Sequence, residues 1–449
     1  MDKYAISKTK KIGLISLGCD KNRVDSEKAL AIVNENAVIT NDISNAEVII
    51  INSCAFLESA RREAINTVIE CNEYRKTGKL EKIVLTGCLP EKFIDELFEE
   101  FTEVDVFLGY KDYDLLFEAL ELSYVSGQRV NFVKKLQNFT KNKRMLTTPC
   151  HYYYLKIADG CNNKCTYCLI PKIRGKYFST PIEELVKEVE NLGYVKELIL
   201  VAQDVTRYGI DLYGKPMLVE LIKQLSSLDY VESIRLLYCY PDMITDDLIE
   251  EISVNDKVVK YLDIPLQHSA SNVLKRMNRK GNSQTYLALI NKLRDKIPNI
   301  SLRSTFIAGF PGETEEDFNE LVNFIKLAKF TNCGFFAYSR EEGTPAYKLP
   351  NQIDEDVKQK RVKKLYSVQR NICKKTQKNY VGKTLTVLCD GVDYEKQSFY
   401  GRAYFSAPDI DGKVYFCSDD VINQGEYYDV YIENFDEYDL YGRVTNELT

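Results

Sequence analysis

Three cysteines within eight residues form the part of the chain whose spacing best defines a chemistry. They are Cys161, Cys165 and Cys168, in the pattern CxxxCxxC. A structural zinc site uses four protein ligands, whereas a cubane iron–sulfur cluster held by three cysteines leaves one iron open to an outside ligand. Zinc completed by Cys150 or His151 is the alternative, although zinc ligands usually come in CxxC pairs. The triplet therefore indicates a cluster built for chemistry.

A second set of three cysteines follows predicted strands near the N-terminus. Apolar, β-rich runs followed by helical patterns are typical of a parallel α/β sheet. These strands are predicted at residues 11–17, 47–51 and 82–85. Cys19, Cys54 and Cys88 each follow one of them, and ligand sites in open parallel sheets lie at the carboxyl ends of the strands. We expect a second three-thiolate cluster here; the alternative is that these cysteines fill strand ends as small core residues, as expected for Cys71.

The elements that must position the first triplet are six strand-like runs separated by helical patterns, which begin after the polar stretch 138–143. The runs span residues 152–158, 197–202, 233–238, 261–264, 301–308 and 334–338. Six βα units predict a partial parallel barrel. Thr180 is expected to cap a helix whose first residue is Pro181.

Loops after the strands of such a barrel build its active site, so the polar residues there are candidates for binding. They are Gln203, Asp204, Gln267 and His268. Two further candidates are Arg303, within the fifth predicted strand, and Gly309, which opens the glycine-rich turn after that strand. Arg303 either holds a carboxylate through a forked pair of hydrogen bonds or forms an ordinary ion pair. His268 either contacts a ligand or is satisfied by backbone hydrogen bonds. No residue is assigned as a catalytic acid or base.

The last segment, after the charged helical run 354–379, contains short β-rich stretches separated by glycine turns. They span residues 385–388, 398–405, 414–417 and 426–432, and they predict a small antiparallel barrel. Residues 377–449 carry six Lys and Arg against fourteen Asp and Glu, a net charge of −8 in a chain of net −6. This sign opposes phosphate binding and suits a basic protein partner; the alternative is that the acidic residues only keep the chain soluble.

The chain has no run of eighteen apolar residues and no basic-then-apolar leader, so neither a membrane span nor a secretory signal is expected. We therefore expect a cytoplasmic protein with no membrane partner. Its thirteen cysteines are then thiols and metal ligands rather than disulfides.

The three expected domains, residues 1–137, 147–378 and 379–449, resemble the layout of the radical S-adenosylmethionine (SAM) methylthiotransferases, whose last domain is a TRAM barrel. The motifs of the RimO branch are matched at residues 16–22 (SLGCDKN), 24–27 (VDSE), 211–214 (DLYG), 237–241 (LYCYP) and 263–268 (DIPLQH). That branch modifies an aspartate of the twelfth protein of the small ribosomal subunit. Asp20 and Thr180 depart from it, standing where proline and arginine are common.

The resemblance implies two [4Fe–4S] clusters and SAM as cofactors. The cluster on Cys161, Cys165 and Cys168 would pass an electron to SAM and release a 5′-deoxyadenosyl radical. The cluster on the N-terminal cysteines would carry or donate sulfur, and a second SAM would supply the methyl group. The implied partners are the ribosomal protein and an electron donor.

Two alternatives to this function remain. A sister enzyme with the same three-domain plan acts on an adenosine of transfer RNA, and fold cannot separate the two. A ribosome-binding module that uses its clusters only to fold is the non-enzymatic alternative.

Overall fold

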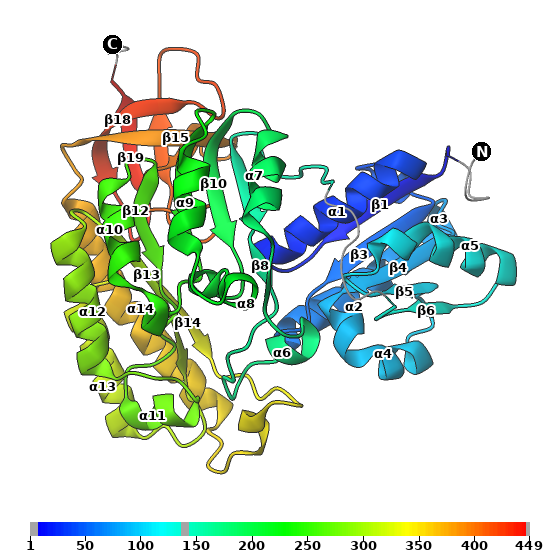
Figure 1. The fold of residues 1–449 in the computed structure, drawn as a ribbon, viewed down its shortest axis with the longest axis horizontal. Helices are drawn as coiled ribbons and strands as arrows, with labels where there is room; N and C mark the ends of the chain where they lie inside the picture. Colours follow the sequence, from blue (N-terminus) through cyan, green and yellow to red (C-terminus); the bar gives the residue numbers. More distant parts are fainter. Residues whose placement is uncertain (1–7, 136–142, 446–449) are drawn as a thin grey trace. The chain divides into compact units, whose positions relative to one another are not determined.

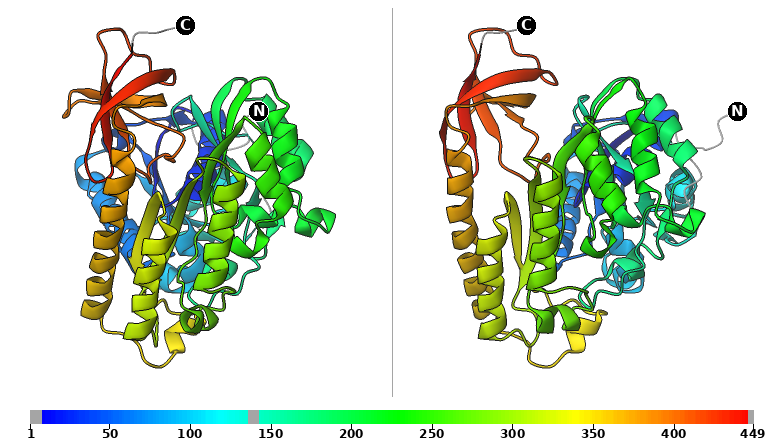
Figure 2. Two further views of the ribbon diagram at one scale, coloured as in Figure 1. Left: turned by 90° about the vertical axis from the view of Figure 1, so that its left-hand side faces the viewer. Right: turned by 60° about the vertical axis from the view of Figure 1, so that its left-hand side comes forward.

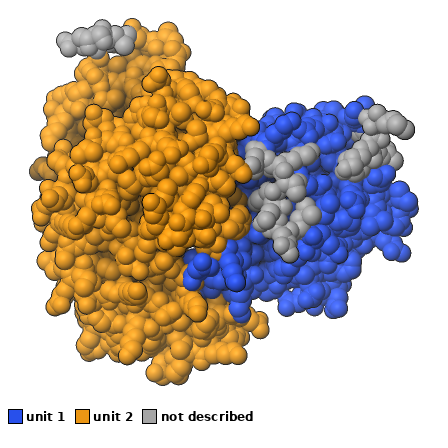
Figure 3. Space-filling view, in the orientation of Figure 1, with its two compact units in different colours: residues 1–147, 160–162, 168–176 blue, residues 148–159, 163–167, 177–449 orange. Residues whose placement is uncertain are grey.

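A computed structural model describes residues 8–135 and 143–445 and divides the chain into two compact units (Figure 3). The first unit comprises residues 1–147, 160–162 and 168–176; the second comprises residues 148–159, 163–167 and 177–449. Most of the polar stretch 138–143 lies outside the described residues. Among the residues described, no helix is both long and apolar enough to cross a membrane.

The first unit contains a six-stranded parallel sheet in the order β2-β1-β3-β4-β5-β6 (Figure 1). Its strands are β1 (Lys11–Ser16), β2 (Val38–Ile39), β3 (Val48–Ser53), β4 (Lys82–Gly87), β5 (Val106–Leu108) and β6 (Val130–Phe132). Its helices are α1 (Asp20–Asn36), α2 (Glu58–Asn72), α3 (Tyr74–Thr77), α4 (Cys88–Glu100), α5 (Leu116–Ser126) and α6 (Ile170–Ile173). The predicted α/β domain is confirmed.

The central strand β3 shows why this sheet is covered on both faces. Val48 and Ile50 belong to one hydrophobic cluster, whereas Ile49 and Ile51 belong to another. Successive side chains of a strand point to opposite faces, so an uninterrupted apolar run needs a packed layer on each side.

The second unit contains the predicted partial (βα)6 barrel, a parallel sheet in the order β14-β13-β12-β11-β10-β7. Its strands are β7 (Tyr152–Lys156), β10 (Val195–Val201), β11 (Val231–Leu236), β12 (Val258–Asp263), β13 (Ser301–Ala308) and β14 (Asn332–Ala337), beside a small pair, β8 (Ala158–Asp159) and β9 (Phe178–Ser179). Its helices are α7 (Ile182–Glu190), α8 (Ile210–Tyr213), α9 (Leu218–Ser226), α10 (Asp246–Val254), α11 (Ser271–Arg276), α12 (Ser283–Lys296), α13 (Glu315–Ala328) and α14 (Glu355–Lys378).

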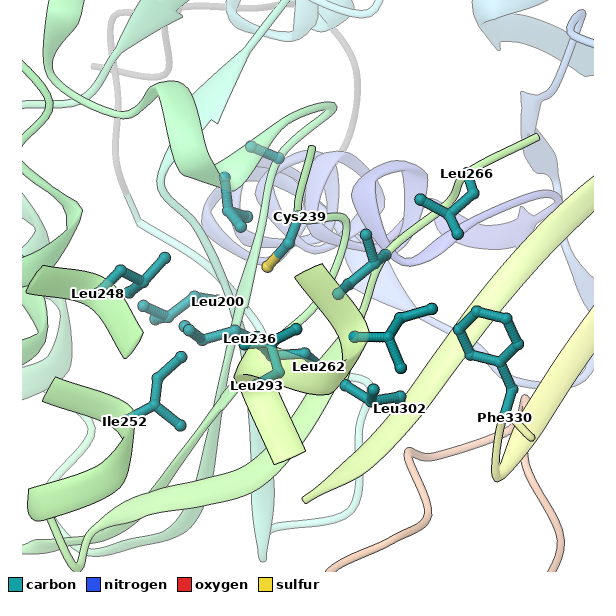
Figure 4. Close-up of a cluster of buried hydrophobic side chains, with 14 of the residues drawn as sticks. Leu200, Leu236, Cys239, Leu248, Ile252, Leu262, Leu266, Leu293, Leu302 and Phe330 are labelled. Atoms are coloured by element: carbon teal, nitrogen blue, oxygen red, sulfur yellow. The ribbon is translucent and has the colours of Figure 1, made fainter. Parts of the chain in front are cut away.

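A row of buried leucines joins this sheet to its outer helices (Figure 4). Leu200, Leu236, Leu262 and Leu302 occupy paired register positions on four adjacent strands. Side chains from α10 and α12, such as Leu293, pack in the same cluster. The layer fixes the strand register, because a slip of one residue would turn each leucine to the other face.

The expected cap of α7 is wrong. Pro181, with φ −54° and ψ 145°, is itself the N-cap, and the helix has no side-chain cap. Thr180 lies before the helix, where its N–H donates to the Ile157 carbonyl at 3.0 Å. That backbone bond keeps Thr180 with the extended segment and moves the helix start one residue along.

The predicted C-terminal barrel is a closed sheet in the order β15-β16-β17-β19-β18. Its strands are β15 (Thr384–Asp393), β16 (Ser398–Arg402), β17 (Val414–Cys417), β18 (Tyr427–Phe435) and β19 (Leu440–Val444). The pairings are antiparallel except for β17 with β19, which is parallel. The strand β19 was not predicted from the sequence. Figure 2 shows the long α14 leading to this barrel.

Buried ion pairs explain why the last two expected domains form one compact unit. Glu197 on β10 accepts a hydrogen bond from Arg235 at 2.6 Å and another from Arg402 of the C-terminal barrel. Arg402 also donates to Asp390 at 2.7 Å, and His151 contacts the same carboxylate at 2.8 Å. Charges buried in this way must stay paired, which ties the barrel to the sheet.

Candidate metal and cofactor centres

The three N-terminal cysteines lie at the carboxyl ends of adjacent strands. Cys19 follows β1, Cys54 follows β3 and Cys88 begins α4 directly after β4. Burial is the main reason that the pKa of Cys54 is raised, and the neighbouring Cys19 thiol adds to the increase. Burial raises the pKa of Cys88 to about 12; the Arg174 guanidinium opposes the increase, and the Cys54 and Cys19 thiols add to it. The three thiols therefore lie close enough to sense one another's charge.

Two glycines allow the turns that bring these thiols together. Gly18 and Gly87 have φ of 99° and 95°, in the left-handed region that favours glycine. A Cβ at Gly87 would lie 2.3 Å from the Asn52 side-chain oxygen, and one at Gly18 would lie 3.0 Å from the Cβ of Cys54. Side chains at either position would disturb the cysteine loops.

Asn22 and Arg174 lie beside the same three cysteines, and neither was predicted from the sequence as a residue of this site. The Asn22 amide donates to the carbonyls of Leu17 and Ser53, both at 3.1 Å, and so joins the first two cysteine loops. Arg174 donates to the Cys88 sulfur at 3.4 Å. Only its place after Cys168, in the same stretch of chain, could have drawn attention to it.

The central triplet divides between the two units, so each cysteine is described in its own unit. The Cys161 N–H donates to the Gly175 carbonyl at 3.1 Å, and the Cys168 sulfur accepts from the Ile170 N–H at 3.4 Å. These contacts are in the first unit.

Cys165 belongs to the second unit. Its sulfur lies 3.8 Å from the Tyr240 hydroxyl and 3.9 Å from a guanidinium nitrogen of Arg279. The structure therefore brings Cys165 to the loop that follows β11. Arg279 was not predicted from the sequence as a residue of this site.

Gln203 and Asp204 follow β10 and differ in what they can offer a ligand. Gln203 donates to Asp159 at 3.1 Å, whereas its own side-chain oxygen is buried without a hydrogen-bond partner. Asp204 accepts from Thr206 at 2.6 Å and from Asn163 at 3.1 Å, and its pKa is raised chiefly by burial. Gln203 has an acceptor free for a ligand, while Asp204 orders the cysteine loop.

Gln267 and His268 follow β12, and both are held by nearby backbone. Gln267 has φ 72° and exchanges backbone hydrogen bonds with Thr305 and Ile307 of β13. His268 is fully buried; its Nδ1 accepts from the Ala270 N–H at 3.0 Å, and its Nε2 lies 3.5 Å from Glu313. The contact of Nδ1 matches the alternative in which His268 is satisfied by backbone hydrogen bonds.

The glycine-rich turn after β13 is organised by Glu313. One carboxylate oxygen accepts from the backbone N–H groups of Gly309 at 2.8 Å and Phe310 at 3.2 Å. The other accepts from Arg361 at 2.7 Å. Gly309 has φ 75°, and a Cβ there would lie 2.3 Å from a side-chain carbon of Lys358. The turn can therefore pass close to α14 only with glycine at this position.

Arg303 is occupied by two carboxylates. Its guanidinium lies 3.1 Å from Asp263 and 3.3 Å from Asp411, a residue of the C-terminal barrel domain. It is also five residues before the end of β13. This geometry matches the alternative in which Arg303 forms an ordinary ion pair.

Thiolates are the ligands of iron–sulfur clusters, so the residue type of both cysteine sets suits the groups that the pattern predicts. Within the described residues, no three His, Cys, Asp or Glu side chains are gathered closely enough to hold a single metal ion. A cubane cluster instead requires separated thiolates, since each binds a different iron. The unpartnered oxygen of Gln203 suits a positively charged amino group, which a bound amino acid derivative would supply.

Three family models match the chain. The model described as the radical SAM superfamily matches residues 155–325, the one described as Uncharacterized protein family UPF0004 matches residues 11–109, and the TRAM domain matches residues 381–445.

Similar proteins span almost all of this chain. It is 47% identical over 443 residues to "Ribosomal protein uS12 methylthiotransferase RimO" of Clostridium botulinum, which covers 98% of this chain and 99% of that protein. The protein of the same name from Clostridium kluyveri is 49% identical over 442 residues, covering 97% and 98%. The solved radical SAM methyltransferase TsrM from Kitasatospora setae has a TM-score of 0.55 at 13% identity, covering 76% of this chain and 77% of that one, and shares the fold.

Proposed function

The chain belongs to the RimO family of ribosomal protein uS12 methylthiotransferases, and from this premise we propose how its residues serve the reaction. It is a radical SAM enzyme that uses SAM and [4Fe–4S] clusters to modify uS12. The identity over nearly the full length of both chains carries this conclusion. The methylthio group would be added to the β-carbon of an aspartate of uS12.

We propose that Cys161, Cys165 and Cys168 hold the cluster that binds SAM. That cofactor supplies a radical able to remove hydrogen from an unactivated carbon, which no side-chain acid or base can do. The protein's own part is to orient the cofactor. Gln203 would accept a hydrogen bond from the amino group of SAM, and the Gly309 turn would border the same cofactor.

We assign the second cluster to Cys19, Cys54 and Cys88. The support is their position at adjacent strand ends and the mutual influence of the three thiols. Metal ligation requires thiolates, so loading of the cluster releases protons from these sites. Arg303, paired with Asp263 and Asp411, is left out of the proposed SAM contacts.

The remaining assignments concern partners. A ribosomal substrate would place the enzyme in the cytoplasm, and an external electron donor is required because the cluster must be reduced before it can cleave SAM. The net charge of −8 over residues 377–449 favours a basic protein over transfer RNA as the substrate.

The test is mass spectrometry of uS12 and of transfer RNA from a strain that lacks this protein. We expect unmodified uS12 aspartate, with methylthio-adenosine unchanged, and restoration by the intact gene. Loss of methylthio-adenosine together with normal uS12 would assign the chain to the sister activity instead.

A further inference from the structure

We propose that Arg174 is a positioning residue of the N-terminal cluster: it holds the Cys88 thiolate in place and raises the cluster's reduction potential. The inference rests on the proposed assignment of Cys19, Cys54 and Cys88 as the ligands of that cluster. Arg174 belongs to the segment that follows the other cysteine triplet, yet its contacts lie in the first unit.

The guanidinium is held from several sides. One terminal nitrogen donates to Asp25 at 2.6 Å; the other donates to Asn22 at 2.5 Å and to the Cys88 sulfur at 3.4 Å. The ring of Tyr110 lies 4.1 Å from its central carbon. Arg174 is only 2% exposed, so water does not replace these partners.

The backbone that carries Arg174 is equally well anchored. Arg174 directly follows α6, and the flanking residues Leu169 and Ile173 are buried in the hydrophobic cluster that also contains Cys88. The Tyr110 hydroxyl donates to the Arg174 carbonyl at 3.1 Å. A flexible surface arginine would lose its alignment with the sulfur, whereas this one is held in place.

An ion pair with Asp25 alone would not explain the second nitrogen, which is directed to Asn22 and Cys88. Arg174 adds a positive charge and an N–H···S hydrogen bond beside a cluster bound by anionic thiolates. Hydrogen bonds to the sulfurs and nearby charge help to set the reduction potential of such clusters. Reduction adds a negative charge, which the guanidinium stabilises, so the residue should raise the potential.

The test isolates the N-terminal cluster in the full-length protein. In a background with Cys161, Cys165 and Cys168 replaced by alanine, anaerobic reconstitution should load about four irons. Reduction is then followed by electron paramagnetic resonance as the potential is varied. Arg174→Gln should retain the iron and lower the midpoint potential. We expect about a tenfold change in the oxidised-to-reduced ratio at a given potential, equivalent to ~59 mV for one electron.

Arg174→Lys keeps the charge and should recover part of the shift. Arg279→Gln in the same background is the matched control: the sulfur that Arg279 contacts belongs to Cys165, which this background lacks, so the midpoint should stay unchanged. Iron lost in Arg174→Gln but kept in Arg174→Lys would support the holding role.

An unchanged midpoint with full iron, or equal loss of iron in both Arg174 variants, would overturn the proposal. If the triple-alanine parent binds no iron, the assignment of Cys19, Cys54 and Cys88 as cluster ligands is itself wrong. Because uS12 is not part of the measurement, failure of the substrate assignment would leave the potential shift intact.

Discussion

The two cysteine sets differ in their surroundings at the level of single residues. Cys88 is buried beside Arg174, while Cys165 is partly exposed beside Tyr240 and Arg279. Burial does not separate the two sets as wholes, because Cys19 is exposed and Cys161 is buried. The difference lies in the polar groups beside single sulfurs, which are Arg174 for Cys88 and Tyr240 with Arg279 for Cys165.

Alanine at Cys161, Cys165 or Cys168 should abolish SAM cleavage, because each change removes a ligand from the cluster that must reduce SAM. The measurement is 5′-deoxyadenosine formed with SAM and a chemical reductant. Cys71→Ala is the matched control, since that buried cysteine of α2 belongs to neither proposed ligand set. Normal deoxyadenosine formation in any of the three variants would show that the ligand set is misassigned.

Alanine at Cys19, Cys54 and Cys88 together should remove four of about eight irons and stop sulfur insertion. SAM cleavage should persist, because the cluster that reduces SAM is intact. Iron content, deoxyadenosine and modified uS12 are measured on the same preparation, with thermal unfolding as a check on folding. Full iron content would refute the second cluster.

At the scale of elements, the turn after β13 depends on one buried carboxylate. Glu313→Ala would leave the Arg361 guanidinium without this partner and free two backbone N–H groups. We expect unfolding free energy to fall by about 3–5 kcal/mol, as when one partner of a buried pair is removed, and SAM binding to weaken.

Glu315 offers a matched control, because it contacts the same Arg361 at 3.1 Å while its side chain is 67% exposed. Glu315→Ala should lower the free energy of unfolding by less than about 1 kcal/mol. Chemical denaturation of the two variants checks the comparison. Equal losses would show that Glu313 does not organise the turn.

The first turn of α4 contains a second buried carboxyl group, Glu91, which is 5% exposed. Burial, with the Asp112 charge adding to it, raises its pKa from 4.5 to about 7. The folded protein therefore binds this proton more tightly than the unfolded chain. The stability it contributes is fully present below pH 4.5 and is lost as pH rises through about 7.

Glu91→Gln mimics the neutral carboxyl group at every pH. At pH 8 the variant should be more stable than the parent protein by up to about 3 kcal/mol, since one pKa unit corresponds to 1.36 kcal/mol. The advantage should shrink toward pH 4.5. Denaturation curves of both proteins across this pH range test the prediction. A stability difference that does not change with pH would contradict it.

At the scale of the whole molecule, charge is concentrated in the C-terminal barrel. Asp419 and Asp420 are exposed just after β17. Asp419→Lys with Asp420→Lys should slow association with isolated uS12, most strongly at low salt, because salt screens the attraction between exposed charges.

Stopped-flow binding at several salt concentrations measures this effect. Glu63→Lys with Glu70→Lys makes the same charge change at exposed positions of α2 and is the control. Equal slowing by both pairs would indicate a general charge effect instead of a binding surface on the barrel. Tight, salt-sensitive binding to transfer RNA would also contradict the assignment.

The sequence by itself determined the fold class and the family, whereas the two cysteine ligand sets stay a prediction. Strands 301–308 and 414–417 were predicted with the bounds observed, because an apolar run of the right length is a local property. Motifs spread from residue 16 to residue 268 identified the family, which similarity along the whole chain confirms.

Only the tertiary structure decided which polar groups meet. Arg174 and Cys88 are 86 residues apart, and Arg303 is 108 residues from Asp411, so no local spacing links them. The parallel pairing of β17 with β19 likewise depends on barrel closure. Spacing and periodicity describe neighbours along the chain, whereas the partner of a buried charge is chosen by packing between distant segments, where an unpaired charge is too costly to remain.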